Sequence, residues 1–251
     1  YCPNGAMTYT YNGEIQGRES CPDGYVNSAD GSFEETACYL TTDAGKYVAT
    51  ITLKGRYKGT KKINYTITPR SPQKLKFTSA TNSVKLTWSK AKEATGYKVY
   101  LYDSKAREYK LIKTTTAASY THSKLSSGKV YTYIVKAYKK VGEQYIYSTS
   151  AKIITATKPA STTITLKSTS KGKVTVSWKN VTGENGFQVF YSTKKDSGFK
   201  KITNCKANST KLTKGSFKSG TKYYFRVRAY KKAGDGYVYS AYSSVKSIRI
   251  K

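Results

Sequence analysis

The sequence predicts an all-β protein built as an elongated array of three consecutive small β-sandwiches. Three observations support this fold class. Apolar and polar residues alternate along short segments, which is typical of half-buried strands. A repeat of about 90 residues runs through the second part of the chain, and this length suits one sandwich per copy. The apolar content is 37%, with 25 Tyr against 7 Phe, which favours several thin cores over one large core.

We expect the first sandwich in residues 1–69. Residues 9–13 are expected to form a strand and a turn, and residues 43–53 a turn followed by an alternating strand. Residues 55–59 are a hairpin candidate, and residues 63–68 are expected to form the closing strand. The Ala-Gly-x-Tyr turn and the Tyr-x-Gly hairpin in these segments resemble the bacterial immunoglobulin-like repeats of Gram-positive surface proteins.

Three of the four cysteines lie in this first module. We expect one disulfide among Cys2, Cys21 and Cys38 in an oxidising compartment, and the sequence leaves its pairing open. The fourth cysteine, Cys205, stands apart. The sequence has no CxxC pair and its only histidine is His122, so it offers no ligand set for zinc. We expect no metal and no other cofactor.

Residues 70–157 and 158–251 are expected to form the second and third sandwiches. The sequence around Trp88 recurs around Trp178 at an offset of 90 residues. The offset later becomes 92, because the second copy carries a net insertion of two residues. Prolines lie at the joints between the modules. Since proline stiffens a linker, they favour the elongated arrangement.

The two copies share a further pattern at the corner before their sixth strand. An apolar residue, a glycine and a tyrosine follow one another at intervals of three, ending in Tyr131 or Tyr223. Together with the tryptophan on the second strand of each copy, these residues resemble the fibronectin type III family. The resemblance implies that Trp88 and Trp178 anchor their cores, and that Tyr131 and Tyr223 hydrogen-bond to the backbone at the corner. It implies a fold rather than a function.

The charge is strongly basic and unevenly placed. The chain has 45 Lys and Arg against 14 Asp and Glu, a net charge of +31. Residues 1–69 hold 7 basic and 7 acidic side chains, so the whole excess lies in residues 70–251. Such asymmetry indicates an anionic partner, and the candidates are wall polymers, acidic glycans, nucleic acid and a lipid headgroup surface. Of these we expect an anionic glycan or a cell-wall polymer and no specific nucleic acid. It fits equally well with lysines that keep exposed sheet edges from pairing.

The sequence shows no constellation of residues that predicts catalysis. Acyl transfer needs a base held beside a nucleophile, and the single histidine, His122, lies in a loop-like stretch between Thr121 and Ser123. Glycoside hydrolysis needs two facing carboxylates, but the adjacent Glu34 and Glu35 would point to opposite faces of a strand. We therefore expect no enzyme activity in these residues.

Alternation also predicts which side chains face outward on the sheets. Where Tyr131, Tyr133 and Val135 face the core, the residues between them face solvent. Aromatic side chains on these faces are interleaved with cations, a combination that stacks on sugars and holds anionic groups. The alternative is pairing of long side chains across strands. The predicted ligand-binding residues are Tyr100, Lys136, Tyr138, Phe190, Tyr224, Arg226, Arg228 and Tyr230.

These observations predict a non-catalytic extracellular or cell-surface region that serves in adhesion or as a spacer. We expect weak binding to anionic glycans or wall polymers, and contacts with other domains of a parent protein. The alternative is an accessory carbohydrate- or cell-wall-binding region of a secreted hydrolase whose catalytic domain lies outside these residues. The chain opens without a signal pattern, so we expect it to be an internal or processed piece. No apolar run of about 20 residues occurs, so membrane insertion is not expected.

Overall fold

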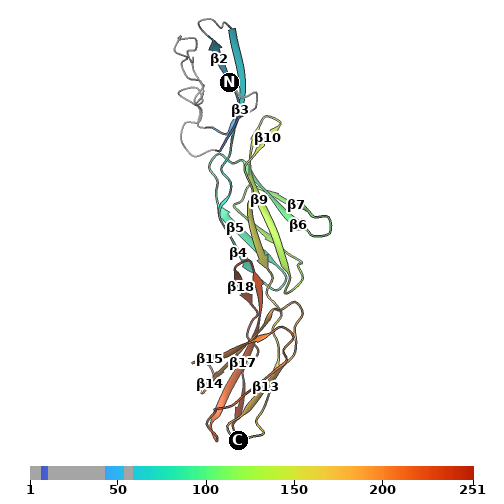
Figure 1. The fold of residues 1–251 in the computed structure, drawn as a ribbon, viewed down its shortest axis with the longest axis vertical. Helices are drawn as coiled ribbons and strands as arrows, with labels where there is room; N and C mark the ends of the chain where they lie inside the picture. The colour runs from blue at the N-terminus through green and yellow to red at the C-terminus, as the bar shows by residue number, and fades with distance from the viewer. Residues whose placement is uncertain (1–6, 11–42, 54–58) are drawn as a thin grey trace. The chain divides into compact units, whose positions relative to one another are not determined.

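The computed structural model of the chain describes residues 7–10, 43–53 and 59–251. These residues form strands β1 to β19 without any helix (Figure 1), which confirms the all-β prediction. Accordingly, no helix capable of crossing a membrane is found among them. The strands of this described part belong to five sheets, one near the N-terminus and two in each copy of the repeat.

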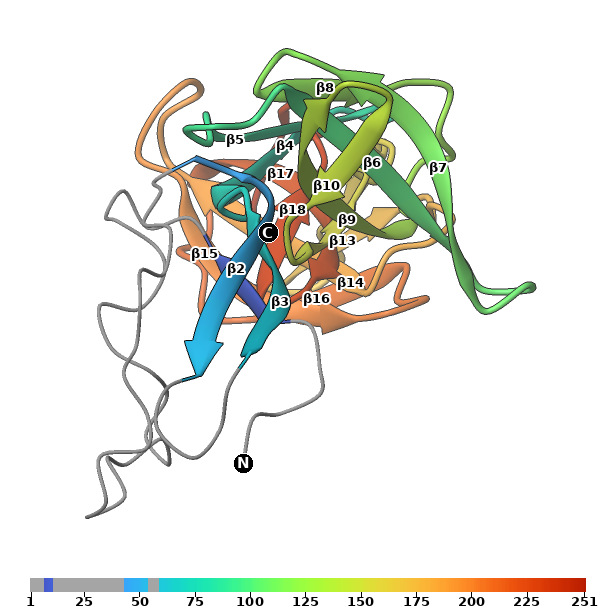
Figure 2. The same ribbon diagram turned by 90° about the horizontal axis from the view of Figure 1, so that it is seen from above.

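The N-terminal segment contains a three-stranded sheet. Strands β2 (Gly45–Leu53) and β3 (Gly59–Thr68) form an antiparallel pair and lie side by side in Figure 2. Strand β1 (Met7–Thr10) pairs with β3 in parallel. The rings of Tyr47 and Tyr65 stack across the pair with their centroids 5.4 Å apart, so a small apolar contact holds β2 against β3.

The predicted strands of this segment are confirmed as β2 and β3, and the first predicted strand overlaps β1. The register brings Leu53 opposite Gly59, as the predicted hairpin requires. The hairpin turn itself lies outside the described residues. So do Cys2, Cys21 and Cys38, and the predicted disulfide among them stays a prediction.

The second module consists of two sheets. The smaller sheet has the order β4-β5-β8, and the larger has the order β10-β9-β6-β7 with β11 also paired to β9. Strand β5 shows the predicted alternation, because Val84, Leu86 and Trp88 are buried and the residues between them are exposed. The strands are β4 (Gln73–Ser79), β5 (Val84–Ser89), β6 (Gly96–Asp103), β7 (Glu108–Thr115), β8 (Ser119–His122), β9 (Val130–Val141), β10 (Gln144–Tyr147) and β11 (Ala151–Ala156).

The third module has the same topology, strand for strand. Its smaller sheet has the order β12-β13-β16, and its larger sheet has the order β15-β14-β17-β18 with β19 also paired to β17. The repeat found in the sequence is therefore a repeat of architecture as well. The strands are β12 (Ile164–Lys167), β13 (Val174–Trp178), β14 (Gly186–Ser192), β15 (Lys200–Lys206), β16 (Lys211–Lys214), β17 (Lys222–Ala233), β18 (Gly236–Tyr239) and β19 (Lys246–Arg249).

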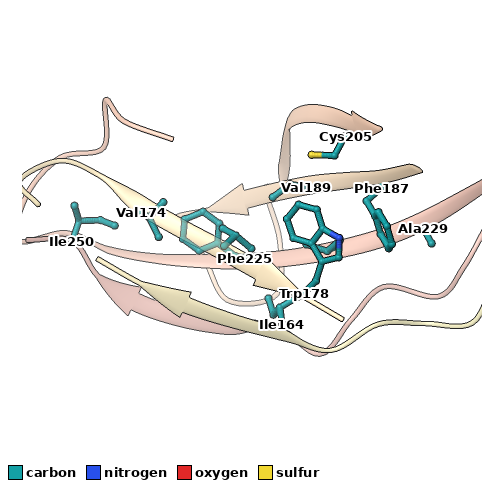
Figure 3. Packing of buried hydrophobic residues seen from close by; sticks show 11 residues of the cluster. Ile164, Val174, Trp178, Phe187, Val189, Cys205, Phe225, Ala229 and Ile250 are labelled. Atoms are coloured by element: carbon teal, nitrogen blue, oxygen red, sulfur yellow. The ribbon is translucent and has the colours of Figure 1, made fainter. Parts of the chain in front are cut away.

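A tryptophan lies in the core of each of these modules. Trp178 is 5% exposed, and its ring lies against Phe187 with the centroids 5.5 Å apart (Figure 3). Cys205 reaches the same apolar cluster from β15. In the second module Trp88 is 6% exposed and meets the edge of Tyr97 at 5.2 Å between centroids. Burying a side chain of this size is a dominant contribution to a thin core.

A tyrosine fixes the corner before the long strand of each larger sheet. The Ser126 N–H donates to the hydroxyl of Tyr131 at 3.0 Å, and the Lys218 N–H donates to the hydroxyl of Tyr223 at 3.4 Å. This is the backbone contact that the family resemblance implies. The intervening Gly128 has a φ of 64°, a left-handed conformation in which glycine avoids the strain of a Cβ.

Candidate functional site

The outward face of β17 carries two arginines, and aromatic rings enclose both. The Arg226 guanidinium carbon lies 4.1 Å from the ring centroid of Phe199 and 3.7 Å from that of Tyr242. The Arg228 guanidinium carbon lies 3.8 Å from the ring centroid of Tyr239 and 5.0 Å from that of Tyr242. Cations and rings therefore alternate in a stack, which we call the arginine–aromatic ladder: Tyr239, Arg228, Tyr242, Arg226 and Phe199.

Two serines hold the tyrosines of the ladder in place. The Ser240 N–H donates to the Ala229 carbonyl at 2.9 Å, and the Ala229 N–H donates to the Ser240 hydroxyl at 2.9 Å. Ser243 repeats this exchange with Val227 at 2.8 and 3.1 Å. Each serine therefore makes the two hydrogen bonds that a residue of a neighbouring strand would make with β17. Its backbone N–H donates, and its side-chain hydroxyl accepts in place of a carbonyl. Sequence reasoning missed this segment, and its signal was the Tyr-Ser-x-Tyr-Ser pattern that begins at Tyr239.

Hydrogen bonds orient Arg228 further. Its Nε donates to Gln188 Oε1 at 2.9 Å, and the Gln188 side-chain amide donates to Asn204 Oδ1 at 3.1 Å. The Nε of Arg226, in contrast, is buried without a hydrogen-bond partner in the described part of the chain. Stacking between two rings is therefore the main interaction that holds the Arg226 guanidinium.

Phe190 was expected to be exposed, and this expectation was wrong. Its side chain is 8% exposed, because the ladder covers it. The ring centroid lies 5.8 Å from the Arg226 guanidinium carbon and 5.4 Å from that of Arg228, and the ring meets Tyr242 edge-on at 5.3 Å. Phe190 thus lies beneath the arginine–aromatic ladder and packs against both arginines and Tyr242.

Tyr138 in the second module was also expected to be exposed, and it too is 8% exposed. The β9–β10 hairpin brings the rings of Tyr145 and Tyr147 to 5.4 and 6.3 Å from that of Tyr138. A glycine makes room beneath it, since a Cβ on Gly96 would lie 2.6 Å from the Tyr138 hydroxyl. Tyr138 is therefore packed between its own sheet and the rings of Tyr145 and Tyr147, and is covered on the outward face.

The other predicted ligand-binding residues are half-buried and have partners within their own modules. The Lys136 Nζ lies 6.0 Å from the ring centroid of Tyr100, and the Lys222 Nζ lies 5.5 Å from that of Tyr224. Tyr230 meets the edge of Tyr237 at 5.5 Å, and desolvation by burial is the main cause that raises the Tyr230 pKa. Pairing of long side chains across strands accounts for the contacts of Lys136 and Tyr230, whereas Lys222 and Tyr224 are neighbours on one face of β17. Ligand binding by these residues stays a prediction.

A lysine is likewise enclosed by aromatic rings in the second module. The Lys98 Nζ donates to the Tyr147 hydroxyl at 2.7 Å and lies 5.0 and 5.2 Å from the ring centroids of Tyr147 and Tyr145. The hydrogen bond to Tyr147 is the main cause that raises the Lys98 pKa. Lys98 therefore contributes to the packing between β6 and the β9–β10 hairpin of its own sheet.

The histidine and the cysteine of the described part, His122 and Cys205, are held by the packing of their modules, and Glu34 and Glu35 lie outside the described residues. The His122 Nδ1 lies 2.9 Å from the Tyr133 hydroxyl, and burial lowers the pKa of the imidazole. Burial raises the pKa of the Cys205 thiol, which disfavours the reactive thiolate. Among the described residues, no group of three His, Cys, Asp or Glu side chains is placed to hold a metal ion.

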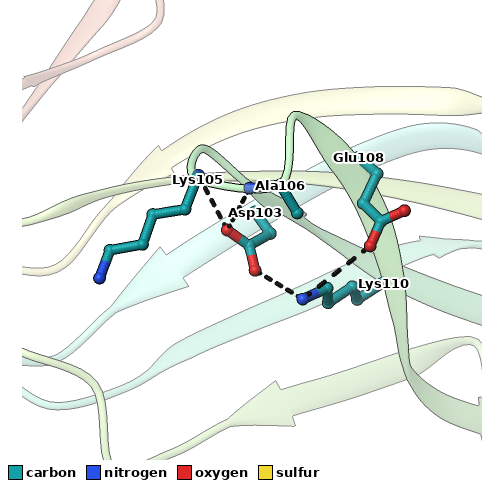
Figure 4. Close-up of polar contacts among 5 residues, drawn as sticks. All are labelled: Asp103, Lys105, Ala106, Glu108 and Lys110. Carbon is teal, nitrogen blue, oxygen red and sulfur yellow. Dashed lines mark hydrogen bonds and ion pairs between the residues drawn. The ribbon is translucent and has the colours of Figure 1, made fainter.

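Asp103 organises the turn between β6 and β7 (Figure 4). Its Oδ1 accepts the backbone N–H groups of Lys105 and Ala106 at 2.9 and 3.2 Å, and its Oδ2 pairs with Lys110 Nζ at 2.8 Å. The hydrogen bond from Lys110, followed by the two backbone bonds, lowers the pKa of the Asp103 carboxyl from 3.8 to about 2. The carboxylate thus stabilises a hairpin turn.

Comparison with known families finds one domain family twice along the chain. The sequence model of the fibronectin type III domain family matches residues 70–154 and again residues 157–246. A segment of two fibronectin type III domains from chicken tenascin aligns at a TM-score of 0.44 with 16% identity, covering 71% of this chain and 99% of the tenascin chain. The FN1–FN3 domains of chicken CNTN1 align at 0.42 with 20% identity, covering 84% and 81% of the two chains.

No curated protein matches the chain in sequence. The family assignment therefore rests on the domain model, whose two matches cover more than half of the residues. The strand order repeated in the two modules and the buried tryptophan in each agree with it. The chain belongs to the fibronectin type III family, with two of these domains in tandem.

Proposed function

We propose that this chain is a non-catalytic extracellular region of a bacterial surface or secreted protein, acting as a spacer and an adhesive segment. In this proposal the N-terminal segment is an immunoglobulin-like module that precedes the two fibronectin type III domains. Domains of this family are commonly extracellular modules of this kind, which supports the proposal. The environments of His122, Cys205 and Asp103 support it as well, because each group serves the packing or a turn of its module.

The adhesive part of the proposal is binding to anionic glycans or wall polymers. The observation that carries it is the charge, since residues 70–251 hold the whole excess of +31. Lysines on the edge strands of the third module are exposed, among them Lys200, Lys206 and Lys211. The arginines of the ladder are stacked on rings of their own module, so exposed lysines supply the cations for this contact. Such binding is electrostatic and weakens as salt rises.

Co-sedimentation with bacterial cell walls tests this proposal. The full chain is mixed with purified Gram-positive walls at low salt, before and after the anionic wall polymers have been removed by mild acid. We expect the chain to sediment with intact walls and to stay in solution with stripped walls. Equal sedimentation with both preparations, or with neither, would overturn the adhesive function. A spacer without adhesion would then be the simpler description.

A further inference from the structure

The third module contains a cavity that the function proposed above does not use. It measures about 320 Å³, which is at the lower end of the ~300–1,000 Å³ typical of small-molecule sites. Residues from both edge strands, β15 and β16, take part in its lining, as do β14, β17 and the chain that leads into β17. The residues that line it include Tyr191, Lys201, Ile202, Lys214, Phe217 and Tyr223.

One side of the cavity is a rigid aromatic wall. The ring of Phe217 contacts Tyr191 and Tyr223 with centroid separations of 5.4 and 4.9 Å. It also packs edge-on against Phe225 of the core at 5.7 Å. The wall is anchored at two further points, because the Phe217 N–H donates to the Gly172 carbonyl and the Tyr223 hydroxyl accepts the corner hydrogen bond. These rings do not need to rearrange before a ligand enters, which reduces the cost of binding.

Two cations complete the lining. Lys201 belongs to β15 and Lys214 ends β16, so they come from different sheets. The register pairs Lys214 with the buried Val174, which puts it on the cavity side of its sheet, whereas Lys201 pairs with Phe190 on the outward face and lies at the rim. Both side chains are exposed. Neither forms an ion pair with a carboxylate in the part of the chain that the structure describes. They therefore remain available for an anion in the cavity.

We propose that this cavity binds an acidic saccharide unit, meaning a sugar ring that carries a carboxylate, a sulfate or a phosphate. The C–H groups of the ring would lie against the aromatic wall, and the anionic group would accept charge-assisted hydrogen bonds from Lys214 and, at the rim of the cavity, from Lys201. The wall favours a sugar over a nucleic acid base: its rings are inclined to one another at 49–84°. They form a hollow instead of a parallel stacking platform. The inference rests on the proposed binding to anionic glycans and assigns a site for it.

The second module has the same strand order, but it lacks most of the residues that line the cavity in the third module. The pairing of Leu111 with Tyr100 corresponds to that of Lys201 with Phe190. The Leu125 N–H bonds to the backbone in the same way as the Phe217 N–H. The corner tyrosine and an isoleucine, Ile202 or Ile112, are common to both. The residues at the positions of Tyr191, Lys201, Lys214 and Phe217 are Leu101, Leu111, His122 and Leu125.

Binding of a uronic-acid tetrasaccharide to the full chain tests the proposal, measured by ¹H–¹⁵N chemical-shift titration. We expect shifts centred on the amides of Lys201, Lys214 and Phe217. The double variant Lys201→Leu with Lys214→His introduces the residues of the second module, and we expect it to bind at least about tenfold more weakly. The control variant, Lys167→Leu with Lys246→His, makes the same two changes at exposed lysines of the same module outside the cavity lining. We expect it to retain binding.

The outcomes separate this inference from the function that underlies it. Equal loss in the two double variants would mean that charge alone binds the saccharide, and the cavity would carry no site. Binding of an anionic polymer without tetrasaccharide shifts at the cavity would overturn the site and leave the adhesive function intact. Stronger shifts at the cavity with an oligodeoxythymidine than with the tetrasaccharide would also overturn it. If neither the polymer nor the tetrasaccharide binds, both proposals fail.

Discussion

The arginine–aromatic ladder should contribute measurably to the stability of the third module. Arg226 lies half-buried between the rings of Phe199 and Tyr242. A cation–π contact contributes about 0.5–1 kcal/mol when exposed and about 2 kcal/mol when desolvated. Arg226→Met keeps the aliphatic stem and removes both contacts. It also removes the buried Nε that has no partner among the described residues, which offsets part of the loss. We expect the free energy of unfolding to fall by about 1–2 kcal/mol.

A double-mutant cycle isolates the contact between Arg226 and Tyr242. Urea unfolding is followed by tryptophan fluorescence in a Trp88→Phe background, so that only Trp178 of the third module reports. We expect a coupling energy of about 0.5–2 kcal/mol between Arg226→Met and Tyr242→Leu. Lys246→Met, on the exposed start of β19, is the control for loss of one charge. A coupling energy below about 0.3 kcal/mol would lie within the scatter of independent sites and would refute the stacking argument.

Three further predictions follow from the fold. Trp178→Ala should lower the free energy of unfolding of the third module by about 3–5 kcal/mol in a urea titration, and a change below about 1 kcal/mol would place the ring outside the core. Tyr131→Phe removes the acceptor of the Ser126 N–H and should lower the free energy of unfolding by about 0.5–1.5 kcal/mol in a urea titration. Tyr223→Phe, which removes a longer bond of 3.4 Å, should lower it by less in the same measurement. The Asp103 carboxyl should titrate with a pKa of about 2 by carbon NMR. Because this pKa is lowered from 3.8, the turn is fully stabilised above about 3.8 and loses that stabilisation as the pH falls through about 2. Lys110→Met should move the midpoint upward, and an unchanged midpoint would contradict the assigned cause.

The sequence allowed prediction of the features that depend on local pattern and on the repeat. Alternation placed Val84, Leu86 and Trp88 on one buried face, and the offset between the copies located the second tryptophan. The role of the corner tyrosines could be predicted because the short pattern that carries them resembles the fibronectin type III family. These features need no knowledge of what lies across the sheet.

The environment of the outward faces could not be predicted in the same way. A period of two tells which face a side chain takes but not what covers that face. Phe190 is covered by a segment about fifty residues further along the chain, and Tyr138 by the next strand of its hairpin. The cavity of the third module escaped prediction for the same reason, since Tyr191, Lys214 and Tyr223 come from separate strands. Sequence spacing alone does not bring them together.

The affinity of the full chain for a soluble anionic polysaccharide, measured across a range of salt concentrations, decides between adhesion and a pure spacer role. We expect binding at low salt that weakens steadily as salt rises, because exposed lysines supply the attraction. A neutral polysaccharide of the same length should not bind. Affinity that is unchanged by salt, or no binding at low salt, would contradict the claim that the basic charge of residues 70–251 serves adhesion.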